Sequence, residues 1–451
     1  MPNSAMAIIA PFRALRFDPR RVDLRQVVTQ PYDKISPEMQ ERYYAASPYN
    51  LVRIVLGKRE TTDGPAQNVY TRAAGYFQEW RKQGIFLEDR EPSVYCYVQN
   101  FKGPEQQALE RRGFIALGRI EDYAANVVFR HEQTLAKPKA DRLELLRATP
   151  AHFEQLFMLY RDPEGEIDRR LAPQTEADIS VRDEYGVQHR VWRIADSQII
   201  DVVRGGMRSK QLIIADGHHR YETALYYRDE RRTAGAAAAA GQEDSGAPVP
   251  ELSRAAPYES VMMTFINMDS PGLVILPTHR VVAGLPSFSS QAFGHRVQQY
   301  FNLEEVDASI DGKRAAAILR EAGRAGFALL AVTADRAMLL DRPRALGSSI
   351  FGGLSLDQQS LDVVQLHQLI LEGALGISKE AIREQQNVSY VRDIGEALDR
   401  VRVGGANVAF LMNPVRMSQV ENIAFAGGVL PQKSTDFYPK LLSGLTIYAL
   451  E

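Results

Sequence analysis

The sequence of 451 residues contains a single cysteine, Cys96, which is too few for an internal disulfide bond. A lone cysteine also excludes zinc and iron–sulfur sites built from several cysteines, and it is typical of proteins from a reducing compartment. Cys96 lies in an alternating stretch, residues 93–98, that predicts a β-strand without a cationic neighbour. We therefore expect a buried, unreactive thiol rather than a nucleophile.

Long apolar runs and an excess of one charge are also missing. No stretch of about 18 uninterrupted apolar residues occurs, which excludes a membrane-spanning helix. Residues 1–13 lack a basic segment followed by an apolar run, so we expect a soluble, cytoplasmic protein. The 54 Lys and Arg residues nearly balance the 56 Asp and Glu residues, giving a net charge of −2. Nucleic acid is therefore not expected as a partner, although a local basic pocket is compatible with this balance.

What is present is the composition of an ordinary globular protein, with 45% hydrophobic and 24% charged residues. The length predicts two or three domains. After residue 233, a run of alanines leads into Gly, Ser and Pro residues that cannot build a core. This break predicts an N-terminal α/β domain over 1–233, a mobile loop or linker over 234–256 and a C-terminal α/β domain over 257–451.

Hydrophobic periodicity predicts alternating strands and helices. The predicted strands are residues 51–56, 94–101, 112–119, 191–194, 211–215, 260–267 and 327–333. The predicted helices are residues 69–83, 141–148, 221–232, 315–322 and 361–372. This pattern favours a mixed fold, α/β or α+β.

The strongest local signal for chemistry is Asp216-Gly217-His218-His219-Arg220, between a predicted strand and a predicted helix. A helix start has unpaired backbone N–H groups and a partial positive charge, so it binds anions, and Arg220 can add a forked contact to phosphate. Histidine and arginine are unfavourable for the helix itself at this end. A segment that breaks a local rule in this way is a candidate functional site.

Two other interpretations of this segment stay open. Asp216 can be a helix N-cap beside histidines that satisfy nearby carbonyl groups. A transition metal can also bind the histidines, but neighbours on a helix point about 100° apart and do not easily share one metal. Mg²⁺ held by Asp216 and by substrate phosphates is favoured over such a metal if the site handles nucleotides.

A second candidate segment, residues 131–142, combines cations and carboxylates before a predicted helix. Lys137, Lys139 and Arg142 can clamp phosphate oxygens, while Glu132 or His131 serves as a base. A solvated charged turn is an equally good interpretation.

A third segment near the C-terminus, residues 431–440, contains Lys433, Ser434 and Thr435 after two glycines. Its hydroxyl groups and lysine suit a phosphate contact, but it lacks the spacing of a P-loop, and a surface loop is equally compatible. Asp33 and His279 are weaker candidates, for which a turn and an ordinary histidine are the favoured interpretations.

Several segments together resemble a bacterial and archaeal family named domain of unknown function 1015, over residues 8–450. The segments that carry the resemblance are Ala10-Pro11-Phe12-Arg13-Ala14-Leu15-Arg16-Phe17, Pro31-Tyr32-Asp33, Ser47-Pro48-Tyr49-Asn50, His131-Glu132-x-Thr134, Asp216-Gly217-His218-His219-Arg220, Leu276-Pro277-Thr278-His279-Arg280 and Pro431-Gln432-Lys433-Ser434-Thr435.

The Asp-Gly-His-His-Arg element also resembles a motif of the ParB and sulfiredoxin-like fold, particularly in ADP-dependent free-serine kinases. This resemblance implies a nucleotide-binding core of that fold with an additional α/β domain. It implies that Asp216, His218, His219 and Arg220 lie at a phosphate site, with Gly217 allowing close approach of the backbone. The cysteine chemistry of sulfiredoxins is excluded because the motif holds no cysteine here, and the DNA clamping of ParB is not expected at this net charge.

The resemblance favours phosphoryl transfer between a nucleotide, ATP or ADP, and a small hydroxylated metabolite, serine or phosphoserine first, with Mg²⁺ as cofactor. In this hypothesis His218, His219 and Arg220 hold phosphates, Asp216 binds the metal or orients a histidine, and Glu132 is the base.

Lys137 and Lys139 would then close over the transferred group. A phosphatase would use the same residues with water as the acceptor. The alternatives are a non-catalytic, ParB-like nucleotide-binding regulator and a hydrolase with a His-bound metal. The expected partner is a small molecule in the enzymatic cases, and a homo-oligomer is compatible with the sequence.

Overall fold

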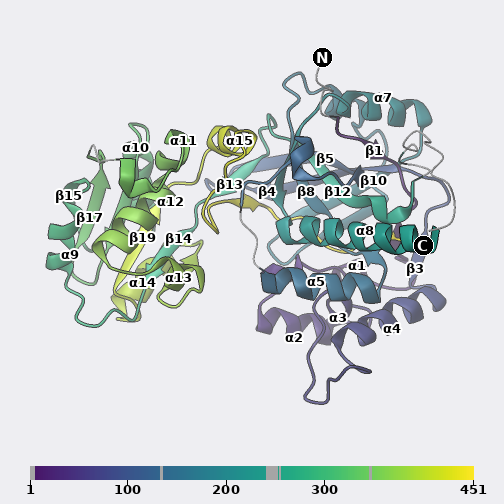
Figure 1. Ribbon diagram of the computed structural model, residues 1–451, viewed down its shortest axis with the longest axis horizontal. Helices are drawn as coiled ribbons and strands as arrows, with labels where there is room; N and C mark the ends of the chain where they lie inside the picture. The colour runs from purple at the N-terminus through teal and green to yellow at the C-terminus, as the bar shows by residue number, and fades with distance from the viewer. Residues whose placement is uncertain (1–5, 133–135, 240–251, 253–254, 345–347) are drawn as a thin grey trace. The chain divides into compact units, whose positions relative to one another are not determined.

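The computed structural model describes residues 6–132, 136–239, 252, 255–344 and 348–451 (Figure 1). The chain divides into two compact units. The first unit comprises Met1–Arg130, Thr134–Val274 and Pro439–Glu451, and the second comprises His131–Gln133 and Ile275–Tyr438. Within the described part of the chain, no helix is both long and apolar enough to cross a membrane.

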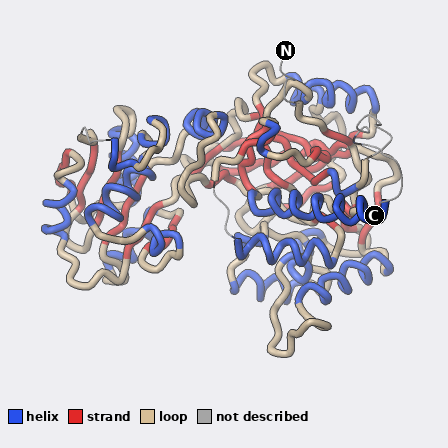
Figure 2. The backbone as a smooth tube through the Cα atoms, viewed as in Figure 1, coloured by secondary structure: helices blue, strands red, loops and turns tan. Residues whose placement is uncertain are grey.

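A nine-stranded mixed sheet forms the centre of the first unit (Figure 2). The strands in spatial order are β6 (Val128–Phe129), β11 (Leu212–Asp216), β8 (Leu156–Tyr160), β12 (Ser260–Asn267), β5 (Ala108–Arg119), β4 (Val94–Lys102), β10 (Gln188–Ile194) and β9 (Ile179–Arg182), with β1 (Ile9–Ala10) paired to β5. The pairs β6–β11 and β8–β12 are parallel, and the other neighbours are antiparallel. The expectation of a mixed α and β fold is confirmed.

One face of this sheet is covered by helices α6 (Glu166–Arg170), α7 (Ser197–Met207) and the beginning of α8 (His218–Ala239). Their apolar side chains form one core with alternate residues of the strands, because successive strand residues point to opposite faces. Cys96 lies in this core, and burial raises the pKa of its thiol to about 12. The expected buried thiol is confirmed.

The opposite face of the sheet contacts the C-terminal segment of the chain through polar side chains. Gln99 Nε2 donates a hydrogen bond to the carbonyl of Lys440 at 2.9 Å. The fully buried Arg111 donates to the carbonyl of Pro439, and its guanidinium lies 4.7 Å from the centre of the Phe157 ring. These contacts fix Lys440 near the sheet.

Short helices and strands complete the first unit. Helix α3 contacts α4, α4 contacts α5, and α5 packs beside α8 (Figure 1). These elements are α1 (Leu24–Val27), η1 (Tyr32–Lys34), α2 (Pro37–Ala46), α3 (Val52–Val55), α4 (Val69–Lys82), η2 (Tyr123–Ala125), α5 (Ala136–Ala148) and η4 (Pro257–Glu259), with the paired strands β2 (Leu15–Phe17) and β3 (Phe86–Glu88), and β7 (Ala151–His152) and β21 (Tyr448–Ala449). The predicted helices at 69–83 and 141–148 are confirmed.

The strand predicted at residues 51–56 is wrong, because this stretch forms helix α3. The Asn50 side chain accepts a hydrogen bond from the backbone N–H of Val52 at 2.9 Å, and the N–H of Leu56 bonds the Val52 carbonyl at 2.9 Å. Val52, Ile54 and Val55 are all buried. A short apolar run buried on all sides has no period that separates strand from helix.

An antiparallel six-stranded sheet with helices on both faces forms the second unit. Its strands in spatial order are β15 (Asn302–Val306), β17 (Ala337–Asp341), β16 (Ala328–Val332), β19 (Val408–Met412), β14 (His279–Val282) and β18 (Val388–Val391). One core includes residues of α9 (Ser290–Val297), α12 (Asp362–Gln365), the π-helical segment η6 (Leu366–Ala374), α13 (Lys379–Arg383) and α15 (Met417–Phe425). The other includes α10 (Gly312–Ala322) and α14 (Ile394–Arg402). The remaining elements are η5 (Ser348–Phe351), α11 (Leu356–Gln359) and the paired strands β13 (Val274–Leu276) and β20 (Asp436–Tyr438).

The observed division differs from the one predicted at residues 234–256. Strand β12 follows that break but pairs with β5 and β8, so the first unit continues through it. Helix α8 extends to Ala239, and residues 240–251 and 253–254 of the predicted linker lie outside the described residues. The change in composition therefore marks a connection inside the first unit, and the C-terminal segment returns to that unit.

Candidate functional site

The segment that the sequence singled out connects β11 to α8 in the first unit. Leu212 and Ile214 of β11 point into the core shared with α6 and α7. A β-bulge then shifts the register, so that Ile214 pairs with Met158 but Asp216 pairs with Phe157. Because a bulge redirects the following side chain, Asp216 faces the opposite side of the sheet, where the C-terminal segment lies.

The Asp216 carboxylate accepts hydrogen bonds from two cations there. Lys440 Nζ lies 3.0 Å from Oδ1, and Arg220 Nη2 lies 2.9 Å from Oδ2. Burial acts to raise the pKa of the Asp216 carboxyl, but the charges of Lys440, Arg220 and Lys34 outweigh burial and lower this pKa well below its ordinary value. Asp216 is therefore ionised at neutral pH and neutralised by its neighbours.

Arg220 is the centre of a larger cluster of charges. Its Nη1 donates to the carbonyl of Gln155 at 2.6 Å, and its side chain is only 12% exposed. Burial acts to lower the pKa of Arg220, but the negative charges of Glu154, Asp216 and Asp33 raise it above its ordinary value. The positive charge of Arg220, in the first turn of α8, is thus surrounded by carboxylates.

Glu154 connects this cluster to two other parts of the first unit. Its Oε1 accepts hydrogen bonds from the backbone N–H of Tyr32 at 2.9 Å and from the Ser443 hydroxyl at 3.2 Å. Tyr32 and Asp33 belong to η1, and Ser443 belongs to the C-terminal segment. We define the Asp216 cluster as Asp33, Glu154, Asp216, Arg220 and Lys440.

The backbone turns at Gly217, immediately before α8. Gly217 has φ +96°, a left-handed conformation that side chains other than glycine rarely adopt. The first helical hydrogen bond runs from the Tyr221 N–H to the Gly217 carbonyl at 2.9 Å. The N–H groups of residues 218–220 therefore precede the helical ladder. The His218 side chain is buried and that of His219 is half-buried.

Helix α5 brings two of the predicted cations beside α8. Lys139 Nζ donates to Glu222 Oε2 of α8 at 2.8 Å. Arg142 is buried, donates to the Val55 carbonyl at 2.6 Å and lies over the Tyr32 ring at 4.1 Å. Lys137 lies in the same helix, and its side chain is outside the described part of the structure.

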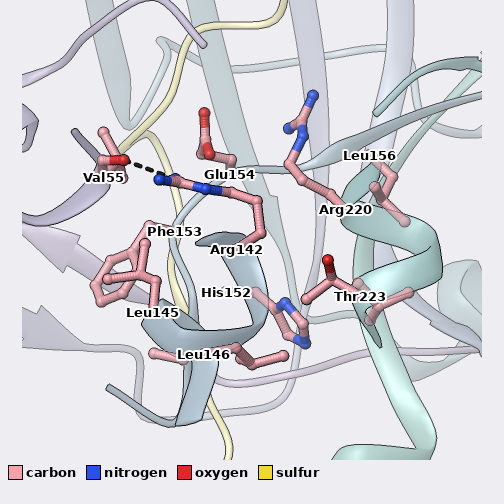
Figure 3. Close-up of a pocket in the computed structure, with 12 residues that line it drawn as sticks. Val55, Arg142, Leu145, Leu146, His152, Phe153, Glu154, Leu156, Arg220 and Thr223 are labelled. Carbon is pink, nitrogen blue, oxygen red and sulfur yellow. Dashed lines mark hydrogen bonds between the residues drawn. The ribbon is translucent and has the colours of Figure 1, made fainter. Parts of the chain in front are cut away.

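A small cavity of about 50 Å³ lies between α5 and α8 (Figure 3). Arg142, Glu154, Arg220 and His152 are among the residues that line it. Burial lowers the pKa of His152 to about 4, so this side chain is neutral at physiological pH. A volume of this size holds one or two water molecules rather than a nucleotide.

The remaining candidates belong to the second unit, where the structure brings the segment at 131–132 together with the one at 430–435. Glu132 Oε1 accepts a hydrogen bond from the backbone N–H of Lys433 at 3.2 Å. His131 Nε2 and Thr435 Oγ1 are 2.7 Å apart, and Ser434 Oγ donates to the carbonyl of Pro431 at about hydrogen-bonding distance. Glu132, Lys433, Ser434 and Thr435 thus form one loop cluster, whereas Lys139 and Arg142 belong to the first unit.

Two members of the Asp216 cluster, Glu154 and Lys440, were not among the site residues predicted from the sequence. Glu154 stands between Phe153 and Gln155, directly before the apolar strand β8, and a carboxylate at the edge of an apolar run is a usable signal. Lys440 closes the third candidate segment, but its pairing with a residue 224 positions away leaves no local trace.

The metal-binding potential of the cluster is limited by its ion pairs. Each Asp216 oxygen accepts a hydrogen bond from a cation, and the positive charges of Lys440 and Arg220 repel a metal ion from this carboxylate. Across the described ranges, no group of three or more His, Cys, Asp and Glu side chains is placed to hold a metal ion.

Gly217 gives a direct test of the local geometry. A Cβ at this position would lie 2.9 Å from Leu156 Cδ2 and 3.1 Å from Arg220 Nη2, in addition to the strain of the positive φ. We expect Gly217→Ala to lower the free energy of unfolding by about 1–3 kcal/mol. The matched control is Gly235→Ala in the same helix, where a Cβ meets nothing within 4 Å and where alanine should be neutral or stabilising. Urea denaturation measures both, and equal effects of the two variants would contradict the account.

Fold and cluster together define a mixed α/β protein with a group of ion pairs at the start of helix α8. The chain belongs to the family described as "Protein of unknown function (DUF1015)", whose model matches residues 9–364. The family resemblance noted in the sequence is thereby confirmed. Among curated proteins, none matches the chain in sequence.

Several solved structures are similar to this chain. A conserved hypothetical protein from Pyrococcus furiosus is 12% identical, with a TM-score of 0.33 over 72% of this chain and 92% of that chain. A free serine kinase in complex with AMP is 13% identical, with a TM-score of 0.33 over 71% of this chain and 89% of that chain. SbnI with a C-terminal truncation, from Staphylococcus aureus, is 10% identical, with a TM-score of 0.34 over 74% of this chain and 87% of that chain.

Proposed function

We propose that this protein transfers a phosphoryl group between a nucleotide, ATP or ADP, and a small hydroxylated metabolite, with serine as the first candidate. The observation that carries the proposal is the arrangement of Arg220 and Lys440 around Asp216 at the start of α8. Enzymes of phosphoryl transfer work mainly by positioning and by neutralising phosphate charge. A helix start with two adjacent cations supplies both.

In this proposal a phosphate group takes over hydrogen bonds that Asp216 now accepts. Arg220 offers a planar fork to two phosphate oxygens, and Lys440 offers a point charge. The N–H groups of residues 218–220 donate to the same group, and Gly217 leaves room for its approach because it has no side chain. Asp216 acts as the anchor that holds both cations ready. His218 and His219 are proposed as further phosphate contacts.

Mg²⁺ enters this proposal as the counter-ion of the nucleotide, which it would hold chiefly through phosphate oxygens. The positive charges of Lys440 and Arg220 beside Asp216 make this carboxylate an unfavourable metal ligand. We therefore assign Asp216 no metal and derive no step through one.

Asp33 is the base that we propose within the first unit. Its side chain is 36% exposed, so a substrate hydroxyl can reach it, and its charge acts on Arg220. Glu154 is less suitable because it is buried and already accepts two hydrogen bonds. In a kinase reaction Asp33 accepts the proton of the serine hydroxyl as its oxygen attacks phosphorus, and the bond from phosphorus to the nucleotide oxygen breaks to release ADP or AMP. In a phosphatase reaction Asp33 accepts a proton from the attacking water, and the bond from phosphorus to the serine oxygen breaks to release serine. Glu132 lies in the second unit, and its assignment as the base remains a sequence-based prediction.

The test is an assay for phosphoserine formed from serine with ATP or ADP and Mg²⁺, and for serine formed from phosphoserine. We expect turnover by the wild type and a loss of about 10²–10⁴-fold in Asp33→Asn, with nucleotide affinity nearly unchanged. Asp201→Asn, an exposed carboxylate of α7, is the matched control and should keep full activity.

Three results would contradict parts of this proposal. Nucleotide binding without turnover in any direction would favour a non-catalytic regulator. Full activity of Asp33→Asn together with an inactive Glu132→Gln would move the base to Glu132. The absence of binding by any nucleotide would remove the phosphoryl-transfer proposal.

A further inference from the structure

The second unit contains a cavity of about 450 Å³ that the proposed function does not use. This volume is in the range of small-molecule binding sites. All of its walls belong to the second unit: helix α12 with η6, helix α13, Tyr390 of β18, Leu354, Gln358 of α11, and the loop at 429–432. Apolar side chains line much of it, namely Leu354, Val364, Ile382, Val429, Leu430 and Pro431.

The π-helical segment η6 supplies one wall of this cavity. The Leu375 N–H bonds the Ile370 carbonyl, five residues earlier, at 2.8 Å, which is the π-helical pattern. The residues of α12 and η6 that face the cavity are Val364, His367, Gln368 and Glu372. His367 and Gln368 follow Val364 by three and four residues, and Glu372 follows Gln368 by four, which places them on one side of the helix. π-Helical turns occur frequently at functional sites.

Two buried polar atoms on this wall lack a hydrogen-bond partner among the described residues. They are His367 Nε2 and Gln368 Oε1. Burying such atoms without a partner is unfavourable, and native proteins usually satisfy them with another group, with water or with a ligand. Burial and the charge of Arg280 lower the pKa of His367 to about 3, so its ring is neutral at physiological pH.

The charges around the cavity are balanced. Lys379 and Arg383 contribute two cations, and Glu372 and Glu380 contribute two carboxylates. Lys379 Nζ and Glu372 Oε2 are 3.8 Å apart, so they neutralise each other in part. A strongly anionic ligand such as a nucleotide would gain little from this balance, whereas a ligand with one charge of each sign finds a partner for both.

We propose that this cavity binds a small zwitterionic metabolite, an amino acid or a dipeptide with a polar, uncharged side chain. Arg383 receives the carboxylate, and Glu380 receives the ammonium group. The uncharged side chain lies against His367 and Gln368, whose buried atoms Nε2 and Oε1 turn toward it on binding, with the Tyr390 ring along one side. The site is separate from the Asp216 cluster, and the inference does not rest on the proposed function.

The experiment uses the full chain and measures its melting temperature with each of the proteinogenic amino acids and with the dipeptide Gly-Gln at millimolar concentration. A ligand that binds only the folded protein raises this temperature. Calorimetric titration then gives the affinity for the most stabilising probe. We expect the affinity to fall at least about tenfold in Gln368→Leu, which keeps the side-chain size but removes the acceptor.

Two controls separate binding from folding. Gln299→Leu, an exposed residue of the second unit, should leave the affinity unchanged. Without ligand, Gln368→Leu should be at least as stable as the wild type, because it removes an unsatisfied buried atom. Stabilisation by none of the probes, or an unchanged affinity in Gln368→Leu, would overturn the inference. Stabilisation by AMP that Gln368→Leu abolishes would overturn the zwitterion assignment.

Discussion

Replacing Asp216 by asparagine is expected to lower the free energy of unfolding by about 3–5 kcal/mol. The change removes one negative charge and leaves Arg220 and Lys440, which are 12% and 7% exposed, without their shared partner. Uncompensated buried charges are strongly destabilising. Chemical denaturation at pH 7 measures the difference. The control is Asp201→Asn, which removes an exposed ion pair with Arg204 and should change stability by no more than about 1 kcal/mol.

The pH dependence gives an independent check of this ion pair. Because Asp216 has a lowered pKa in the folded state, its stabilising effect is fully present above the ordinary aspartate pKa of about 3.9. It is lost as the pH falls further toward the folded-state pKa. The stability difference between wild type and Asp216→Asn should therefore be constant from pH 5 to pH 7 and shrink below about pH 4. A difference that grows on acidification would contradict the account.

Replacing Arg220 by methionine is expected to weaken ADP binding by about 100-fold or more. Methionine keeps the length of the side chain but removes the forked donor that the proposal places on a phosphate. Arg220→Lys should recover only part of the affinity, because lysine restores the charge but not the planar fork. Calorimetric titration is the proper measurement, since both variants also disturb Asp216. Arg204→Met, a partly exposed arginine in α7, is the control. Equal ADP affinity in Arg220→Met and the wild type would remove the phosphate site from α8.

The sequence predicted those parts of the fold whose pattern is local. The alternating residues of β4 and β5, separated by a polar turn, and the amphipathic stretch of α4 are found where they were expected. The β11–α8 connection was also predicted, because a buried strand, a glycine and a helix follow one another within a few residues. Family membership followed from motifs distributed over the whole chain.

The parts that were missed depend on distant residues. Helix α3 was predicted to be a strand because its Val and Ile residues are all buried, and a short run of buried apolar residues shows no helical period. The change in composition after residue 233 lies inside the first unit, because β12 returns to pair with β5 and β8. Lys440 meets Asp216 only through the path of the C-terminal segment along the sheet, and no local pattern reports such a pairing.

The most direct test of the central claim is to observe the histidine rings of the ¹⁵N-labelled full chain by NMR while ADP is added. Signals of His218 and His219 can be assigned by comparison with the single variants His218→Gln and His219→Gln. The account predicts that ADP shifts these two signals and leaves that of His295, which is exposed in the second unit, unchanged. ADP binding that leaves both His218 and His219 signals in place would show that the nucleotide binds elsewhere and would contradict the phosphate site at the start of α8.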